Sequence, residues 1–151
     1  MLFRSRDTVG CAALDAAGNL AAGASTGGIT AHLPGRVGDT ALVGAGLYAD
    51  NRLGGACVMT GDGESILRLG MARVSLDLLR EEGEPEGAAA RTIGLLGARG
   101  VSGEAGCILL DRQGRVGWAH NSSHMACAYQ TASMEQPAYF VKKAAPPTGK
   151  P

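Results

Sequence analysis

The sequence predicts a layered α+β fold, because segments of strand character and segments of helical character occupy separate stretches of the chain. Apolar strand-like segments come first, two helical segments follow, and a second strand hairpin comes after them. This segregation is typical of an antiparallel sheet with helices on one face rather than of a doubly wound α/β sheet. The 151 residues suffice for one domain with a core, since 45% of them are hydrophobic.

The first expected element is a hairpin. Residues 8–15 alternate small and apolar side chains and predict a buried strand. A turn over 16–19 joins it to a second strand over 20–24. Residues 25–46 are rich in glycine and polar residues, so we expect a long functional loop there.

The middle of the chain predicts a third strand and two helices. The strand is expected over 54–60, and residues 61–64 form a strand-to-helix corner. From Ser65 the apolar residues fall at helical spacing and predict one helix, which is broken at 83–85. A second helix is expected over 86–96.

The last part of the chain predicts a second hairpin, with strands over 105–110 and 115–120, and a final short strand over 138–141. The tail over 144–151 is rich in proline and lysine and is expected to be disordered. An antiparallel sheet with helices on one face leaves its other face bare. We therefore expect another part of a parent domain, or a partner, to cover that face.

Composition argues against several classes of function. The formal net charge is zero and the charges are scattered, so no basic face for nucleic acid is predicted. No apolar run is long enough for a membrane-spanning helix, and residues 1–6 lack the apolar part of a signal peptide. The four cysteines are widely spaced without a CxxC pair, which favours free thiols in a reducing, cytoplasmic compartment. No cofactor is predicted.

Four groups of polar residues and glycines stand at the ends of the expected elements. Thr8 opens a strand, Thr26 lies in a Ser-Thr-Gly-Gly run, Arg36 and Asp39 stand three apart between glycines, and Thr60 precedes Gly61 at the corner. Each group alone has a structural explanation, as a strand former, a turn, a surface ion pair or a helix N-terminus. A hydroxyl and a backbone N–H aimed at one point are also what an oxyanion hole requires. Their joint occurrence favours function.

The chain resembles the plant-type asparaginase and isoaspartyl peptidase family of N-terminal nucleophile hydrolases in three stretches, DTVGCAALDAAGNLAAGASTGGIT, PGRVGDTALVGAGLYADN and TGDGESILRLGMARVSLDLL. The resemblance is close over residues 7–79 and looser through the following helix and hairpin. It implies an αββα fold in which residues 8–143 form the C-terminal, nucleophile-bearing half and residues 1–7 are a precursor remnant or a non-native segment. The N-terminal half of the same precursor is then the expected partner, in a dimer of heterodimers. One departure is Ala31, where the family commonly has Asn.

In this family a precursor cuts itself immediately before a threonine, and the resemblance places that cut between Asp7 and Thr8. The new N-terminal Thr8 would then be the nucleophile and its α-amine the base. A Thr hydroxyl is a poor nucleophile until a base accepts its proton. A free α-amine can do so near neutral pH, because its pKa is roughly 7.7–8.0.

The resemblance implies the other roles by position. Thr26 corresponds to the threonine that orients the nucleophile. Arg36 corresponds to the clamp on the substrate α-carboxylate and Asp39 to the acceptor of the α-ammonium group, and the planar fork of an arginine suits the first role. Thr60 and Gly61 correspond to the oxyanion hole and also contact the substrate. The implied reaction is hydrolysis of L-asparagine and β-aspartyl (isoaspartyl) dipeptides through an acyl-enzyme.

Several alternatives stay open. A glycosylasparaginase typically has Asn at the position of Gly27, and a taspase-type protease is a more distant relative. In a catalytically silent fragment, Thr8 would keep its peptide bond and the amine base would not exist. The residues His120, His124 and Cys127 have a spacing that could hold zinc on a helix, but a strand end and a loop are expected there and no fourth ligand is near, so no metal site is predicted.

Overall fold

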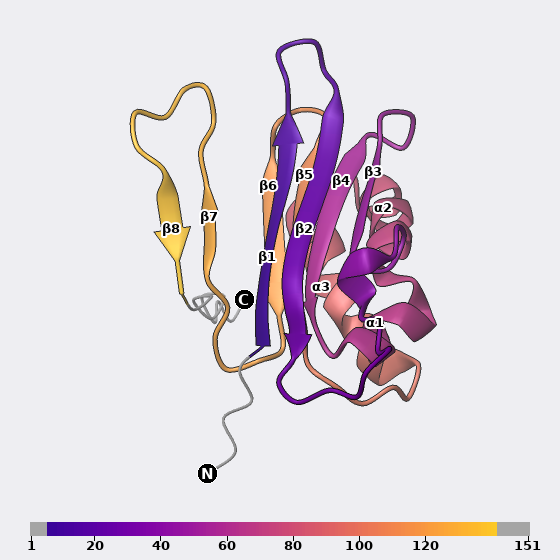
Figure 1. The fold of residues 1–151 in the computed structure, drawn as a ribbon. Coiled ribbons are helices and arrows are strands. Elements are labelled where there is room, and N and C mark those ends of the chain that lie inside the picture. The colour runs from indigo at the N-terminus through magenta and orange to yellow at the C-terminus, as the bar shows by residue number, and fades with distance from the viewer. Residues whose placement is uncertain (1–5, 142–151) are drawn as a thin grey trace.

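A four-stranded antiparallel sheet lies between a layer of helices and a two-stranded hairpin in the computed structural model, which describes residues 6–141 (Figure 1). The sheet has the order β3-β4-β5-β6, with strands β3 (Leu47–Asp50), β4 (Gly55–Gly61), β5 (Ala105–Asp111) and β6 (Val116–His120). The helices are α1 (Gly63–Leu69), α2 (Met71–Glu82) and α3 (Pro85–Ala98), and the last two pack on one face of the sheet. The hairpin of β1 (Arg6–Leu14) and β2 (Leu20–Ile29) packs on the other face.

A second hairpin, of β7 (Cys127–Tyr129) and β8 (Ala138–Phe140), stands beside the main body and pairs only with itself among the described strands (Figure 1). An aromatic contact anchors it, because the Phe140 ring lies 5.6 Å from the Trp118 ring of β6, centroid to centroid. Aromatic pairs at this separation add to the stability that burial provides.

The core lies between the sheet and the helices. Side chains alternate along a strand, so every second residue of β4 and β5 points toward α2 and α3. Those residues include Cys57, Met59, Cys107 and Leu109, and Leu76 of α2 meets them with no exposed surface. Both faces of β4 and β5 are mostly buried, which is why the sequence shows these strands as continuous apolar runs.

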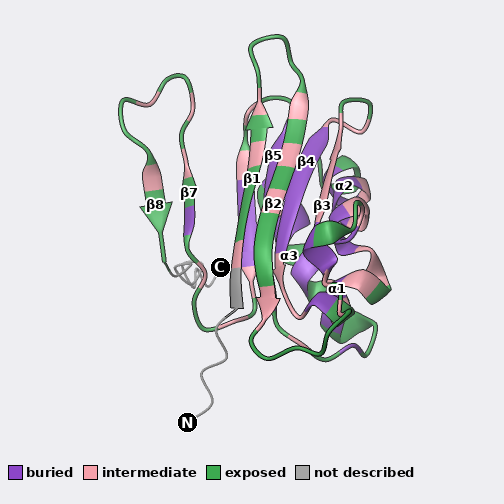
Figure 2. Ribbon diagram, in the orientation of Figure 1, coloured by how far each residue is buried: buried purple, intermediate pink, exposed green. Residues whose placement is uncertain are grey.

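Close contact on the other face depends on a glycine of β1. A Cβ atom at Gly10 would lie 3.0 Å from the Cβ atom of Val58 on β4. The hairpin can therefore approach the sheet closely enough to bury Val58, which is 4% exposed. The prediction that this face of the sheet is bare was wrong, because β1 and β2 cover it. The uncovered surface is the outer face of the hairpin, where Val9 is 72% exposed (Figure 2).

Several boundaries differ from the prediction. The expected loop over 25–46 begins later, because β2 runs to Ile29 and carries the Ser-Thr-Gly-Gly run within the strand. A short 3-10 helix, η1 (Asp39–Ala41), lies within this loop, and β3 and β7 were not predicted. The expected single helix is two helices, because Gly70 adopts a left-handed conformation with φ of 58° and ends α1.

The described residues begin at Arg6 and end at Val141. The tail over 144–151 and residues 1–5 lie outside the described residues. The backbone of Arg6 and Asp7 belongs to β1, so the strand begins before Thr8. No helix within residues 6–141 is long and apolar enough to cross a membrane.

Ala31 offers a test of local strain in the turn after β2. It is the one non-glycine residue of 6–141 with a positive φ, 58°, a region that costs an L-residue about 1–2 kcal/mol. We expect Ala31→Gly to raise the free energy of unfolding by about 0.5–1 kcal/mol, after the greater entropy of glycine in the unfolded chain is subtracted. Ala21→Gly, at a negative φ inside β2, should lower it by a similar amount. Urea denaturation of both variants checks this, and a loss of stability in Ala31→Gly would contradict it.

Candidate active site

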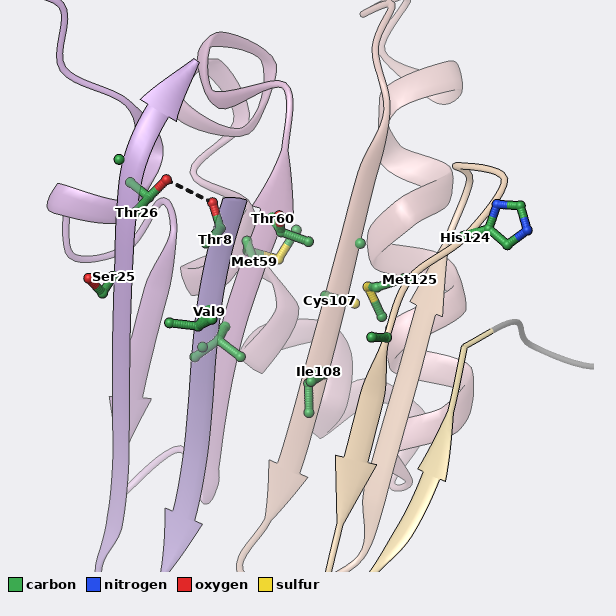
Figure 3. A pocket seen from close by; sticks show the side chains of 15 residues that line it. Thr8, Val9, Ser25, Thr26, Met59, Thr60, Cys107, Ile108, His124 and Met125 are labelled. Carbon is green, nitrogen blue, oxygen red and sulfur yellow. Dashed lines mark hydrogen bonds between the residues drawn. The ribbon is translucent and has the colours of Figure 1, made fainter. Parts of the chain in front are cut away.

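Thr8 and Thr26 face each other across the β1–β2 ladder. They are paired in the strand register, and the Thr8 hydroxyl donates a hydrogen bond to the Thr26 hydroxyl at 3.0 Å (Figure 3). The Thr26 oxygen also accepts a hydrogen bond from the backbone N–H of Gly28, at 3.0 Å. The Thr26 side chain is thus held by its own strand while it contacts Thr8.

A β-bulge lies directly before Thr8. Arg6 pairs with Ile29 and Thr8 pairs with Thr26, so one residue of β1 is opposite two residues of β2. Gly28 supplies the extra residue and has a φ of 83°, which favours glycine. The peptide bond between Asp7 and Thr8 therefore lies at an irregularity of the ladder.

The two threonines open into a cavity of about 820 Å³ between the hairpin and the sheet. The residues that line this cavity include Thr8, Thr26, Met59, Thr60, Gly106 and Met125. Figure 3 shows Thr60 on the neighbouring strand beside Thr8, with Met125 on the opposite side of the cavity. Three hydroxyls from three strands thus meet in one cavity.

The corner after β4 lies next to this cavity, because Thr60 lines it and Gly61 follows Thr60. Gly61 has a φ of 136°, and a Cβ atom there would lie 2.2 Å from the carbonyl oxygen of Glu104. Only glycine fits this position. A second cavity of about 710 Å³ includes Thr60 and Gly61 and shares Met125 with the first, so the corner borders both.

Arg36 is held in an ion pair that was not predicted. Its Nε and Nη2 atoms donate to the two carboxylate oxygens of Glu64 at 2.8 and 3.1 Å. Those hydrogen bonds are the main reason that the pKa of Arg36 is raised. The guanidinium lies close to the backbone at Gly28 and Gly38, where a Cβ atom would be 3.7 and 3.1 Å from Nη1. The Arg36 guanidinium is therefore fixed along its Nε–Nη2 edge.

Asp39 is the next charged group beside Arg36. The residue is 6% exposed, and its Oδ2 atom has no hydrogen-bond partner within the described part of the chain. Burial raises the pKa of Asp39, although the Arg36 charge lowers it in part. An ionised Asp39 is therefore costly in the native state above its usual pKa, and that cost disappears as the pH falls. A cation that reached Oδ2 would offset the cost.

The predicted residues are thus brought together in two groups. Thr8, Thr26 and Thr60 line one cavity, whereas Arg36 and Asp39 do not line it. The two groups adjoin through glycines. A Cβ atom at Gly28, two residues after Thr26, would lie 3.7 Å from Arg36 Nη1, and one at Gly63, two residues after Gly61, would lie 2.8 Å from Asp39 Oδ1.

Glu64 was missed as a site residue. The only signal for it in the sequence was its place in the glycine-rich corner over 61–64, next to residues that the pattern had marked. Its partner Arg36 is 28 residues away, so the pairing comes from the packing of η1 and α1.

Other reactive groups do not form a site in the described residues. No cluster of three or more His, Cys, Asp or Glu side chains within 6–141 could hold a metal ion. His120 Nδ1 instead contacts the Ser122 carbonyl oxygen at 2.9 Å. Cys57 is fully buried, and desolvation raises the pKa of its thiol to about 12, so it is unreactive.

A family model and individual relatives both match this chain to asparaginases. A family model described as asparaginase matches residues 3–139. The chain is 39% identical over 132 residues to a plant-type L-asparaginase of Pyrococcus horikoshii. The aligned region covers 87% of this chain and 42% of that protein. It is 45% identical over 123 residues to an isoaspartyl peptidase/L-asparaginase of Bos taurus, covering 80% of this chain and 39% of that protein. The chain thus spans about two fifths of the length of these relatives.

Proposed function

This chain belongs to the asparaginase family, and we propose that it is the nucleophile-bearing part of an amidohydrolase that acts on L-asparagine and β-aspartyl dipeptides. The observation that carries the proposal is the hydrogen bond between the Thr8 and Thr26 hydroxyls beside Thr60 in one cavity. Relatives that are named for asparaginase and isoaspartyl peptidase activity support the substrate class.

We propose that Thr8 first becomes the chain terminus. Its hydroxyl attacks the carbonyl carbon of Asp7, the C–N bond breaks, and the α-amine of Thr8 takes a proton as an ester forms. Water then hydrolyses the ester, so the segment through Asp7 leaves as a carboxylic acid. The bulge opposite Gly28 supports this site, because bulges interrupt regular pairing and often lie beside active sites.

Turnover follows the same chemistry on a substrate amide. The freed amine accepts the proton of the Thr8 hydroxyl, whose oxygen attacks the side-chain amide carbonyl. The hydroxyl of Thr60 and the backbone N–H of Gly61 stabilise the resulting oxyanion. The amine leaving group departs with a proton, and water cleaves the acyl-Thr8 ester to release aspartate. Thr26 orients the nucleophile throughout.

Arg36 and Asp39 would recognise the amino-acid head group. The Asp39 Oδ2 atom, which has no hydrogen-bond partner among the described residues, suits the α-ammonium group, and binding that group would offset the cost of burying the carboxylate. The Arg36 edge that does not face Glu64 remains for the α-carboxylate. Arg36 and the buried Asp39, side by side, would thus bind the two opposite charges of the amino-acid head group.

Arg36→Lys is expected to weaken substrate binding. A point charge cannot replace a planar fork that holds Glu64 by two hydrogen bonds and still offers a free edge. We expect KM for asparagine to rise about tenfold or more, with a smaller change in kcat. Steady-state kinetics checks this, with Arg68→Lys on the exposed side of α1 as the control. An unchanged KM would contradict the clamp role.

The partner in this proposal is the N-terminal half of the same precursor, in a dimer of heterodimers. The outer face of the β1–β2 hairpin supports it, because apolar Val9 there is 72% exposed and small side chains surround it. The relatives are more than twice the length of this chain, so they contain further segments that could cover this face. A cytoplasmic location is part of the same proposal.

The proposed function is tested by mass and by ammonia release. The purified chain is compared alone and after co-expression with an N-terminal half, by intact mass spectrometry and by hydrolysis of L-asparagine. Loss of residues 1–7 together with ammonia release would support the enzyme. A full-length mass without ammonia release under both conditions would leave a catalytically silent fragment.

A further inference from the structure

Asp62 stands at the N-cap of α1 but does not cap the helix. An aspartate at this position normally accepts a hydrogen bond from the second or third N–H of its helix. Here the Asp62 side chain makes no such bond. Its Oδ2 atom accepts instead from the backbone N–H of Glu104, at 3.0 Å. The carboxylate is therefore directed away from the helix and toward the segment that leads into β5.

The same two residues are joined a second time through the backbone. The N–H of Asp62 donates to the carbonyl oxygen of Glu104 at 2.7 Å. Asp62 thus holds the peptide groups on both sides of Glu104, one by a main-chain bond and one by a side-chain bond. Two bonds to adjacent peptide groups fix both the position and the orientation of Glu104.

The Asn121 side chain holds the same two peptide groups from the other side. Its Oδ1 atom accepts from the N–H of Ala105 at 2.7 Å, and its Nδ2 atom donates to the carbonyl oxygen of Gly103 at 3.0 Å. The Asn121 backbone N–H also donates to the carbonyl oxygen of Ala105, at 3.1 Å, so the segment 103–105 is fixed between Asp62 and Asn121 by five hydrogen bonds.

This segment is the surface against which Gly61 rests. A Cβ atom at Gly61 would lie 2.2 Å from the Glu104 carbonyl oxygen and 2.6 Å from the Ala105 Cα atom. Contact this close means that a shift of Glu104 must shift Gly61. An oxyanion hole works by the preorganised position of its donors, and small displacements of reacting groups are costly to the rate.

We propose that Asp62 is a positioning residue, which sets the Gly61 N–H for the developing oxyanion by tethering Glu104; this inference rests on the proposed function. The Asp62 carboxylate binds the Glu104 N–H, and so fixes the corner, instead of capping α1. The contrast with α3 is direct, because Glu84 at its N-cap accepts hydrogen bonds from the N–H groups of Glu86 and Gly87.

Three Asp62 variants and one control separate positioning from stability. Asp62→Asn keeps an acceptor oxygen in place, so it should retain most of kcat. Asp62→Ser restores a helix cap but is too short to reach Glu104, so Tm should hold or rise while kcat falls about tenfold. Asp62→Ala should lower kcat similarly, with KM for asparagine changed less than about twofold. Glu84→Ala should lower Tm by a few degrees and leave kcat unchanged.

Hydrogen exchange supplies a readout that does not depend on activity. In Asp62→Ala and Asp62→Ser the Glu104 amide should exchange about tenfold faster than in the wild type, and in Asp62→Asn it should not. An unchanged Glu104 exchange rate would overturn the tether. Faster exchange with an unchanged kcat, in an active wild type, would overturn the positioning role. A processed wild type that hydrolyses neither asparagine nor a β-aspartyl dipeptide would overturn the proposed function itself, and the positioning role with it.

Discussion

Thr8→Ala is expected to abolish amide hydrolysis, with kcat/KM for asparagine reduced about 10³-fold or more. The substitution removes the hydroxyl that would attack both the Asp7 carbonyl and the substrate. We therefore also expect the chain to keep residues 1–7, which intact mass spectrometry detects. The fold should survive, because the hydroxyl makes one hydrogen bond, to Thr26, which is worth about 1 kcal/mol.

Thr8→Ser is the matched control, since it keeps a hydroxyl at the same strand position. We expect it to retain cleavage before residue 8 and measurable ammonia release, at a reduced rate. Ammonia release above a few per cent of the wild-type rate in Thr8→Ala would rule out Thr8 as the nucleophile. Cleavage of Thr8→Ala at the same bond would rule out self-processing by this hydroxyl.

Gly61→Ala is expected to damage both stability and turnover. The added Cβ would meet the Glu104 carbonyl oxygen at 2.2 Å, and alanine is strained at a φ of 136°. We expect the free energy of unfolding to fall by about 2 kcal/mol or more, and kcat to fall about 10²-fold or more as the proposed oxyanion donor moves. Denaturation and steady-state kinetics on the same preparation measure both.

Gly23→Ala is the control for adding a methyl group to a strand glycine. Gly23 lies in β2 with a negative φ, and a Cβ atom there would have nothing within 4 Å. Stability should stay level or rise slightly, because glycine loses more entropy on folding. If both glycine variants behaved alike, the close approach of Gly61 to Glu104 would not be what constrains the corner.

The regular hairpins were predictable because both follow local rules. Buried strands appear as short apolar runs and turns favour aspartate and glycine, so the hairpin expected over 105–110 and 115–120 lies within one residue of β5 and β6. The end of β2 was not predictable in this way, because the two glycines of the Ser-Thr-Gly-Gly run have low strand propensity. Pairing with β1 keeps that segment extended.

The break between α1 and α2 also comes from tertiary packing. Apolar spacing is continuous on both sides of Gly70, so the sequence favours one helix. In the fold, the first N–H groups of α2 at Ala72 and Arg73 donate to the carbonyl oxygens of Ala45 and Gly44. A distant loop thus supplies partners for a second helix start, which a local pattern does not contain.

The candidate site likewise has residues that the sequence identified and residues that only the packing of the fold reveals. Resemblance to a family located Thr8, Thr26, Arg36, Asp39, Thr60 and Gly61 before any geometry was known, and their chemical roles remain predictions. It did not identify Glu64 or Asp62 as functional, because their importance lies in contacts with Arg36 and Glu104, 28 and 42 residues away. Such pairings follow from how elements pack rather than from neighbours in the chain.

The bulge at Gly28 divides the β1–β2 ladder very unevenly. Within residues 6–141 the register holds one pair before the Asp7–Thr8 bond, Arg6 with Ile29, and seven pairs from Thr8 to Leu14. If that bond broke, Thr8 would become the first residue of an intact seven-pair ribbon. A new terminus made there would be anchored from its first residue, so its position would not depend on the piece that left.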